Sequence, residues 1–493
     1  MEPKSFPPAH QSATAEAGVR SHRVARVFVW SVWFVMMLFA LACIARYGRN
    51  IPLAEDWQLV APLTGQEPNL VGWLWSQNNE HRVPLPRLML LGLLKVTNGD
   101  FRVGMFFNAI TLGVLALAMI QVARHLRGGR TEFADAFFPV ALLHMGNWEN
   151  LVWSWQLSFV VPTALICGIL LVMLACPTLA TPGAAVFVGV SLVSLPLCGG
   201  VGLLFVPFLA LWLSYCGVLH WYAVKTNGGR QWISGFLLGS AAIALCIIGL
   251  YFVGYQRPSW NAPSPGVGAT LQTAAKFLAL GFGPVAAKSW KLSIFVAFAL
   301  LVPSIGVAVS GVLRHKGLER HRALGMLVFF SILVVFALAM GWGRAGLVPT
   351  VGMPMRYVLF SVPALCTAFF VWELYGSRRF RTLVQRGLLL GMCLLIPFNT
   401  MAGFQWRDWY LGGMNAVEQD LLAGTPRSLI AKRHGEFLIH WWDEAKLAAH
   451  MQMLHDAGSG PFAKMPEAPV TSPKIPLGYC LTTLLTASGT QLL

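Results

Sequence analysis

An acidic pair stands directly after the first strongly apolar run of the chain. Glu55 and Asp56 lie in the stretch AEDW, and Glu67 and Glu80 follow within the next 25 residues. The whole protein has only 20 acidic residues, so this concentration is unusual. A carboxylate beside an apolar helix end is costly unless it is solvated, paired or used, which makes Asp56 a candidate functional residue.

Two further short stretches carry ionisable side chains. They are QNNEHRVPLPRL, residues 77–88, and GRAGLVPTVGMPMRY, residues 343–357. Their candidate residues are Glu80, His81, Arg82, Arg344, Arg356 and Tyr357. Trp residues surround these stretches, and the preference of indoles for the membrane interface explains that enrichment without a functional role.

These side-chain types suit one reaction, the attack of a hydroxyl on the anomeric carbon of a sugar attached to a lipid phosphate. A carboxylate takes the proton of the acceptor, and Asp56 is the first candidate for this role. Arginines hold the phosphate leaving group, because a guanidinium offers a planar, two-pronged set of donors. An apolar groove accepts the lipid tail.

The composition indicates a membrane protein that positions these groups on helices. Of 493 residues, 56% are hydrophobic and 11% are charged, against about 25% charged in an average soluble domain. Apolar runs of about 20 residues, enough to cross a hydrocarbon core of about 30 Å, recur along the chain up to residue 404. Because each run must satisfy its own backbone hydrogen bonds in lipid, the sequence predicts an all-α polytopic bundle.

About eleven transmembrane helices are predicted, of which the third and fifth are short. They lie at residues 27–46, 103–123, 133–145, 157–176, 184–197, 201–223, 232–254, 291–313, 323–341, 357–375 and 387–404. Arg20, Arg23 and Arg26 precede the first run and place the amino terminus in the cytoplasm by the positive-inside rule. The acid-rich loops then face outward. The short loops favour the inner membrane of a bacterial cell, with a periplasmic carboxyl terminus.

Three parts are expected along the chain. Residues 1–25 form a disordered cytosolic tail. Residues 26–404 form the transmembrane module, whose first outward loop spans residues 47–102. Residues 405–493 are richer in charged side chains and form a small extracytoplasmic segment.

The acidic pair in the first outward loop resembles the signature of the GT-C superfamily of integral-membrane glycosyltransferases, which use polyprenyl-phosphate sugars. The stretches 77–88 and 343–357 also resemble segments of bacterial GT-C-like proteins. The resemblance implies transfer of a sugar from a polyprenyl-phosphate donor to a glycan, lipid or protein acceptor on the outer face of the membrane. It also implies short helices lying on the membrane in the first loop, which VGWLWSQ and LPRLMLLGLLKV fit.

Transferred residue by residue, the resemblance makes Asp56 the catalytic base and Glu55 its neighbour or substitute. It implies substrate binding by Glu80, His81, Arg82, Arg344, Arg356 and Tyr357. Of these, Glu80 or His81 would orient the sugar or the acceptor. The two later arginines would face the lipid phosphate.

No cofactor is predicted, and a divalent cation is left open. His440 and Glu444 are four residues apart in HWWDEAKLAAH, with His450 further on, but the stretch has no HExxH pattern or tight ligand set. A solvated amphipathic helix near the bilayer is the favoured interpretation. The nine cysteines show no CxxC or metal spacing and are expected to be small hydrophobic residues in the bundle.

Three other classes of protein remain as alternatives. An O-antigen ligase or polymerase also acts on polyprenyl-linked glycans through outward arginines, but it would leave the acidic pair without a role. A transporter or flippase of a lipid-linked glycan needs charges along a path, whereas the predicted spans are almost uncharged. A structural membrane protein would use the outward charges to bind a partner. The net charge of +16 does not indicate nucleic-acid binding, because the basic residues cluster in short loops.

Overall fold

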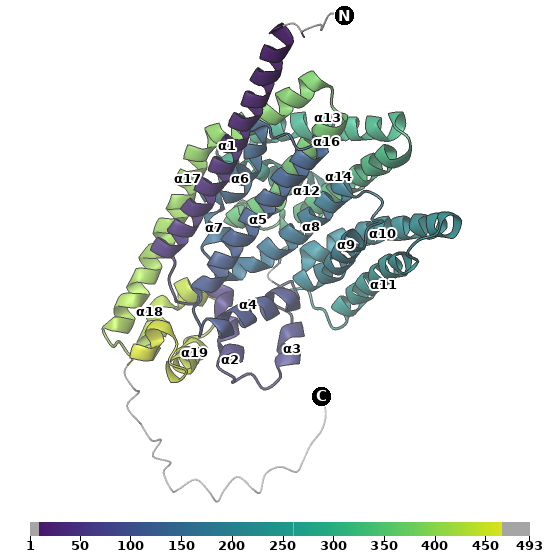
Figure 1. The fold of residues 1–493 in the computed structure, drawn as a ribbon. Helices are drawn as coiled ribbons and strands as arrows, with labels where there is room; N and C mark the ends of the chain where they lie inside the picture. Colours follow the sequence, from purple (N-terminus) through teal and green to yellow (C-terminus); the bar gives the residue numbers. More distant parts are fainter. Residues whose placement is uncertain (1–8, 260, 466–493) are drawn as a thin grey trace, which may run out of the picture.

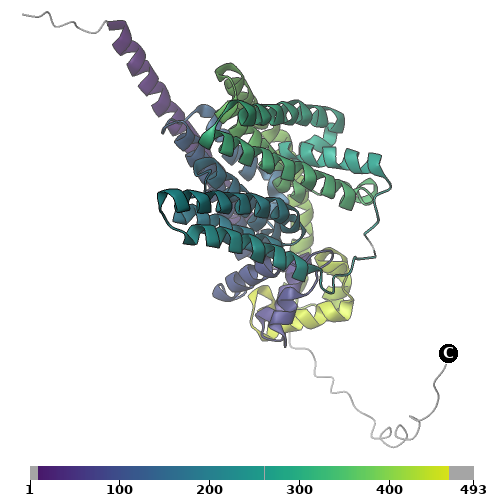
Figure 2. The same cartoon turned by 90° about the vertical axis from the view of Figure 1, so that its right-hand side faces the viewer.

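The fold is a bundle of long helices, shown from two sides in Figures 1 and 2. A computed structural model describes residues 9–259 and 261–465, and every regular element in those ranges is a helix. Nine helices within them are long and apolar enough to cross a membrane. These are α1 (Ala9–Tyr47), α5 (Arg102–Leu126), α8 (Leu157–Ala175), α10 (Gly200–Asn227), α11 (Trp232–Phe252), α13 (Trp290–Arg314), α14 (Gly317–Arg344), α16 (Val358–Tyr375) and α17 (Arg378–Leu422).

The all-helical membrane architecture is thus confirmed, whereas the count of about eleven crossings stays a prediction. The third expected span forms η2 (Phe133–Ala136) and α6 (Phe137–Leu143). At about 1.5 Å per residue, these are too short to cross a bilayer as one helix. The fifth expected span forms α9 (Pro182–Ser194) and η5 (Leu195–Cys198), which together make a shorter apolar helix.

The first loop and the carboxyl-terminal helices lie at the same end of the bundle, opposite the start of α1 (Figures 1 and 2). We call this the capped end. Its elements are η1 (Ala54–Leu59), α2 (Val60–Leu63), α3 (Leu70–Trp75), α4 (Pro84–Val96), α18 (Arg427–Ile439), α19 (Glu444–Asp456) and η9 (Gly460–Lys464). α18 packs against η1, and α19 packs against α2. Trp57 of the loop meets Phe462 edge-on, with ring centroids 5.8 Å apart. The loop and the carboxyl-terminal helices therefore form one packed unit.

α17 is a single helix of 45 residues that leads into the capped end (Figure 1). The composition change expected at residue 405 therefore falls inside a helix and does not coincide with a linker. α17 also packs closely on the rest of the bundle. A Cβ atom added at Gly403 would lie 1.9 Å from the carbonyl oxygen of Met145, so only glycine permits this approach.

Between α6 and α8 the chain forms short helical turns in place of a continuous span. They are η3 (Met145–Asn147), α7 (Trp148–Leu151) and η4 (Ser154–Gln156). Irregular backbone inside a membrane bundle needs internal partners for its polar groups. Asn108 Nδ2 donates to the carbonyl oxygens of Asn150 and Trp153, both at 3.2 Å. Asn147 Nδ2 donates to the carbonyl oxygen of Leu142 at 3.1 Å. Buried asparagines thus hold this broken segment in place.

A second irregular segment lies between α11 and α13, where the sequence predicted no helix. It contains α12 (Val267–Ala279), η6 (Leu280–Phe282) and η7 (Pro284–Ser289), and α12 packs against α14 and α16. Asn399 of α17 is fully buried and holds the turn between η6 and η7. Its Nδ2 donates to the Phe282 carbonyl oxygen at 2.9 Å, and its Oδ1 accepts from the Val285 N–H at 3.0 Å. One side chain therefore ties this segment to α17.

Replacing Asn399 with leucine should destabilise the protein, whereas a substitution at an exposed position of the same helix should have a much smaller effect. The substitution leaves the Phe282 carbonyl and the Val285 N–H buried without partners, which costs about 2–5 kcal/mol in unfolding free energy. Thermal unfolding of the purified protein in detergent measures the loss. Met401→Ala on the same helix is the control, because Met401 is 56% exposed. Equal melting temperatures for the two variants would contradict this role of Asn399.

Candidate functional site

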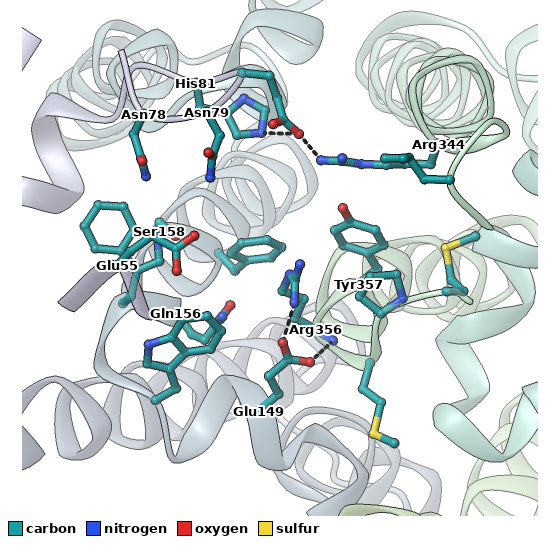
Figure 3. A pocket seen from close by; sticks show the side chains of 18 of the residues that line it. Glu55, Asn78, Asn79, His81, Glu149, Gln156, Ser158, Arg344, Arg356 and Tyr357 are labelled. Carbon is teal, nitrogen blue, oxygen red and sulfur yellow. Dashed lines mark hydrogen bonds and ion pairs between the residues drawn. The ribbon is translucent and has the colours of Figure 1, made fainter. Parts of the chain in front are cut away.

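A cavity of about 680 Å³ lies at the capped end (Figure 3). Most of its lining comes from the first loop, the broken segment before α8 and the loop after α14, and Trp406 of α17 and His440 at the end of α18 complete it. Its ionisable lining residues are Glu55, Glu80, His81, Glu149, Arg344, Arg356, Tyr357 and His440. Side chains from distant parts of the sequence therefore meet at one place.

A tight turn aims Glu80 and His81 at the cavity. The Asn78 N–H donates to the His81 carbonyl at 2.6 Å, and the His81 N–H donates to the Asn78 carbonyl at 2.8 Å. Asn79 in the turn has a φ of 50°, a left-handed conformation that asparagine adopts more readily than most residues. The Tyr255 hydroxyl donates to the Glu80 carbonyl at 3.4 Å, which ties the turn to the end of α11.

Two arginines on the cavity wall are each held by a glutamate. Arg356 Nη1 donates to Glu149 Oε1 at 2.5 Å, and the Arg356 backbone N–H donates to Glu149 Oε2 at 3.1 Å. Arg344 Nη2 donates to Glu80 Oε1. Figure 3 shows Arg344 and Arg356 on either side of Tyr357, and their guanidinium carbons lie 5.8 and 5.7 Å from its ring centroid. Each guanidinium has five donors, so both keep donors for an anion in the cavity.

The carboxylate of Glu80 stays ionised in this arrangement. Burial alone would raise its pKa, but His81 and Arg344 outweigh that effect, and the net shift of the Glu80 pKa is downward. A glutamate that remains charged beside Arg344 is a firm partner for that cation. Glu80 is therefore better suited to orient Arg344 than to accept a proton.

Glu55 differs from the other two glutamates because it has no ion-pair partner among the described residues. Its Oε2 has no hydrogen-bond partner in that part of the chain, and Figure 3 shows its carboxylate directed into the cavity. Loss of hydration inside the protein raises the pKa of Glu55, and the positive charge of Arg356 opposes this shift. Glu55 is thus a carboxylate with a raised pKa and one oxygen, Oε2, that accepts no hydrogen bond from the described residues.

Asp56, the next residue, is not part of the cavity lining. It is 1% exposed, and its Oδ2 accepts from the Leu53 N–H at 3.3 Å, which caps the start of η1. Burial raises the pKa of Asp56 well above its ordinary value, with the Leu53 N–H opposing the shift. The geometry therefore favours Glu55 over Asp56 as the carboxylate that meets a substrate, and the base role of Asp56 stays a prediction.

Arg82 also lies outside the cavity lining. Its Nη1 donates to the Trp75 carbonyl and its Nη2 to the Val253 carbonyl, both at 2.9 Å. These bonds join the first loop to the end of α11. The structure therefore places Arg82 behind the wall, whereas it brings together the other candidates, Glu55, Glu80, His81, Arg344, Arg356 and Tyr357.

Three residues at the cavity were not among the predicted site residues. Glu149 precedes Arg356 by 207 residues, and nothing in the sequence links the two. His440 was considered only as a metal ligand, yet it lines the cavity from the end of α18. Asn79 could have been found, because asparagine favours turns and tolerates the left-handed conformation.

The site offers no evident metal centre. Among residues 9–259 and 261–465, no group of three or more His, Cys, Asp or Glu side chains could hold a metal ion. Glu80 and Glu149 are paired with arginines, which reduces their capacity to bind a cation.

Comparisons with protein-family models, with curated proteins and with solved structures gave no match for this chain. The functional assignment therefore depends on the residues and the geometry of the cavity.

The raised pKa of Asp56 predicts how its replacement by asparagine changes stability with pH. A raised folded-state pKa gives stability that is fully present below the unfolded pKa of about 4 and is lost as the pH rises through the folded value. We therefore expect the melting temperature of Asp56→Asn, relative to the wild type, to increase as the pH rises above about 4.

Asp100→Asn is the control with the opposite sign. Burial raises the pKa of Asp100, but hydrogen bonds from Arg102 outweigh burial, and the net shift is downward. Its replacement should therefore cost stability at neutral pH and cost less in acid. If the difference in melting temperature between Asp56→Asn and the wild type does not vary with pH, the prediction is wrong.

Proposed function

We propose that this protein is a membrane glycosyltransferase that moves a sugar from a polyprenyl-phosphate donor to a hydroxyl of an acceptor, as its resemblance to the GT-C superfamily implies. One observation carries the proposal. One cavity at an end of an apolar bundle combines Glu55, a carboxylate with no ion pair in the part of the chain that the structure describes, with two oriented arginines, Arg344 and Arg356. Base and phosphate-binding groups are both needed for this transfer.

In the proposed reaction, the acceptor oxygen attacks the anomeric carbon while Glu55 takes the proton of that hydroxyl. The bond from the anomeric carbon to the phosphate oxygen breaks, and polyprenyl phosphate leaves with the electron pair. The raised pKa of Glu55 supports this role, because a base is most effective when its pKa lies near the working pH. Glu55 later releases the proton to water.

The arginines stabilise the charge that develops on the leaving phosphate. Arg356 is fixed by two contacts with Glu149, so its remaining donors are oriented before a substrate arrives. Oriented donors of this kind cost little reorganisation during the reaction. Arg344, fixed by Glu80, supplies a second cation on the other side of Tyr357.

The loop between α14 and α16 offers an apolar path for the lipid tail of the donor. It contains α15 (Val348–Val351) and η8 (Met355–Tyr357). Val348, Met353 and Met355 line the cavity beside Arg356. A donor whose phosphate meets the arginines would extend its first prenyl units over these side chains toward the bilayer. The basic loops support an outward orientation of the capped end.

The geometry favours this function over transport. At the end of the bundle opposite the cavity, Arg127 bonds to Asp135 and to Glu373, each at 2.7 Å, and all three side chains are buried. This ion-paired cluster packs α5, η2 and α16 together at that end. A cavity at one end and a packed ionic cluster at the other favour a one-sided site.

Glu55→Gln should lower the turnover number by about 10²–10⁴-fold, because the base is lost while the side-chain volume is kept. The assay follows release of polyprenyl phosphate from undecaprenyl-phosphate-linked hexoses and pentoses by the protein in nanodiscs. The activity of the wild type should fall in acid as Glu55 is protonated, with a midpoint above the ordinary glutamate pKa of about 4.3.

Asp56→Asn separates the two neighbouring carboxylates in the same assay. We expect it to keep most of the activity, because Asp56 is outside the cavity lining. Loss of activity in Asp56→Asn but not in Glu55→Gln would return the base role to Asp56. Activity in both variants that still depends on the arginines would favour the ligase or polymerase alternative.

Arg356→Ala should reduce kcat/KM for the lipid-linked donor by about 10²-fold or more, as expected when a charged hydrogen-bond donor to a phosphate is removed. Arg356→Lys should restore only part of this loss, because lysine lacks the planar fork. Arg257→Ala is the matched control, since Arg257 is exposed and lies outside the cavity lining. An Arg356→Ala protein with normal kcat/KM and reduced thermal stability would show a purely structural role.

A further inference from the structure

A second cavity, of about 360 Å³, lies between the first loop and α19. Its lining side chains come from both parts of the capped end, the first loop and the carboxyl-terminal segment. Gln58, Trp73, Gln77 and Asn78 belong to the first loop, whereas Trp442 lies in the turn before α19 and Lys446 lies in α19. The catalytic proposal above gives this cavity no role.

The lining combines indole rings with planar polar side chains. Trp73 and Trp442 are both half-buried; Trp73 comes from the first loop and Trp442 from the carboxyl-terminal segment. Gln58 and Asn78 supply amide donors and acceptors, whereas the Gln77 amide already bonds to the backbone of Asn79 and Gln256. A saccharide presents C–H faces, which pack on aromatic rings, and hydroxyl groups, which bond to amides and to charged side chains. The chemistry of this lining therefore fits a sugar.

Arg87 makes the wall of the second cavity rigid. It is 2% exposed, and its Nη1 donates to the Trp73 carbonyl at 2.6 Å and to the Ser76 carbonyl at 2.8 Å. Its guanidinium lies 5.1 Å from the Trp73 ring centroid, and its Nη2 donates to Gln58 Oε1 at 3.2 Å. Trp73 and Gln58 are thus held in place, and a preformed wall loses less entropy when a ligand binds.

The opposite wall is also arranged around an indole. Lys446 Nζ lies 4.3 Å from the Trp442 ring centroid, and the His450 ring centroid lies 4.5 Å from it. Lys446 is exposed, so its ammonium can also contact a bound molecule. Trp442 is therefore held by its neighbours at the mouth of the cavity.

The two cavities are neighbours, because Asn78 lines both of them. Gln58 Nε2 donates to Asn78 Oδ1 at 2.9 Å, which fixes the amide at this boundary. Figure 3 shows Asn78 beside Asn79 on the wall of the first cavity, on the same side as Glu55. A molecule that fills the second cavity and extends past Asn78 would enter the first cavity near Glu55.

We propose that the second cavity binds an oligosaccharide, which is the acceptor of the transfer reaction. The acceptor role depends on the proposed transferase function, whereas oligosaccharide binding does not. Polar amides and charged groups make up most of this lining, which disfavours a lipid acceptor. Every regular element described at the capped end is helical, so no strand edge is offered to an extended peptide.

Binding of full-length protein in detergent to an array of immobilised neutral and uronic-acid-containing oligosaccharides tests the site. We expect the wild type to bind a subset of the array. Trp442→Ala should weaken this binding at least about tenfold, and Lys446→Met about three- to tenfold. Trp441→Ala and Lys432→Met are matched controls, because both residues are exposed and lie outside the lining. They should bind as the wild type does.

The site inference is overturned if no oligosaccharide on the array binds, or if the folded Lys446→Met and Trp442→Ala proteins bind as well as their controls. Retention of the protein only by polyprenyl phosphate or by immobilised peptides, added to the same array, also overturns it. Lys446→Met keeps the test valid if Trp442→Ala fails to fold, because Lys446 is on the surface.

Glu55→Gln separates this inference from the proposed function. It should bind the array as the wild type does while losing transfer. Array binding without any donor turnover by the wild type would remove the transferase proposal and the acceptor role but leave the oligosaccharide site. Donor turnover that no array oligosaccharide stimulates, with no array binding, would leave the transferase and remove the site.

Discussion

Backbone hydrogen bonding inside lipid is the constraint on which this structure depends. A continuous helix satisfies it without help, but a broken helix needs side chains to complete the bonds. Asn108, Asn147 and Asn399 supply such bonds from buried positions. Because of them the chain can leave the helical conformation within the bundle, and one of these departures carries Glu149 to the cavity. The amides that stabilise the bundle thus also create the site.

The ion pair between Glu149 and Arg356 has both a structural and a chemical effect. The Glu149 side chain is 7% exposed, and a charge at that depth without a partner would be strongly destabilising. Arg356 removes this cost, and in return Glu149 fixes both the guanidinium and the backbone N–H of Arg356. Asn150 adds a bond to the Arg356 carbonyl at 3.0 Å. The orientation of Arg356 therefore follows from the folding of the broken segment.

Hydropathy and charge were enough to predict a helical membrane protein, because long apolar runs have few other solutions in lipid. They also located the stretches that hold Glu55, Glu80 and Arg356. The helix α12 escaped prediction, and the predicted span at residues 133–145 forms only the short helices η2 and α6, since the stability of α6 and α12 comes from tertiary contacts with α14, α17 and buried amides. The sequence named both Asp56 and Glu55 but could not decide which of them lines the cavity, because adjacent residues of the helix η1 point about 120° apart.

The length of α17 has a geometric consequence for the capped end. At about 1.5 Å per residue, its 45 residues extend for about 68 Å. Asn399, Trp406 and Tyr410 on this one helix contact, in turn, the irregular segment after α12, the first cavity and the first loop. One residue added beyond Tyr410 would turn α18 and α19 by about 100° about the axis. The number of residues in α17 is thus as important to the site as their identity, since it sets the angle at which Trp442 faces Trp73.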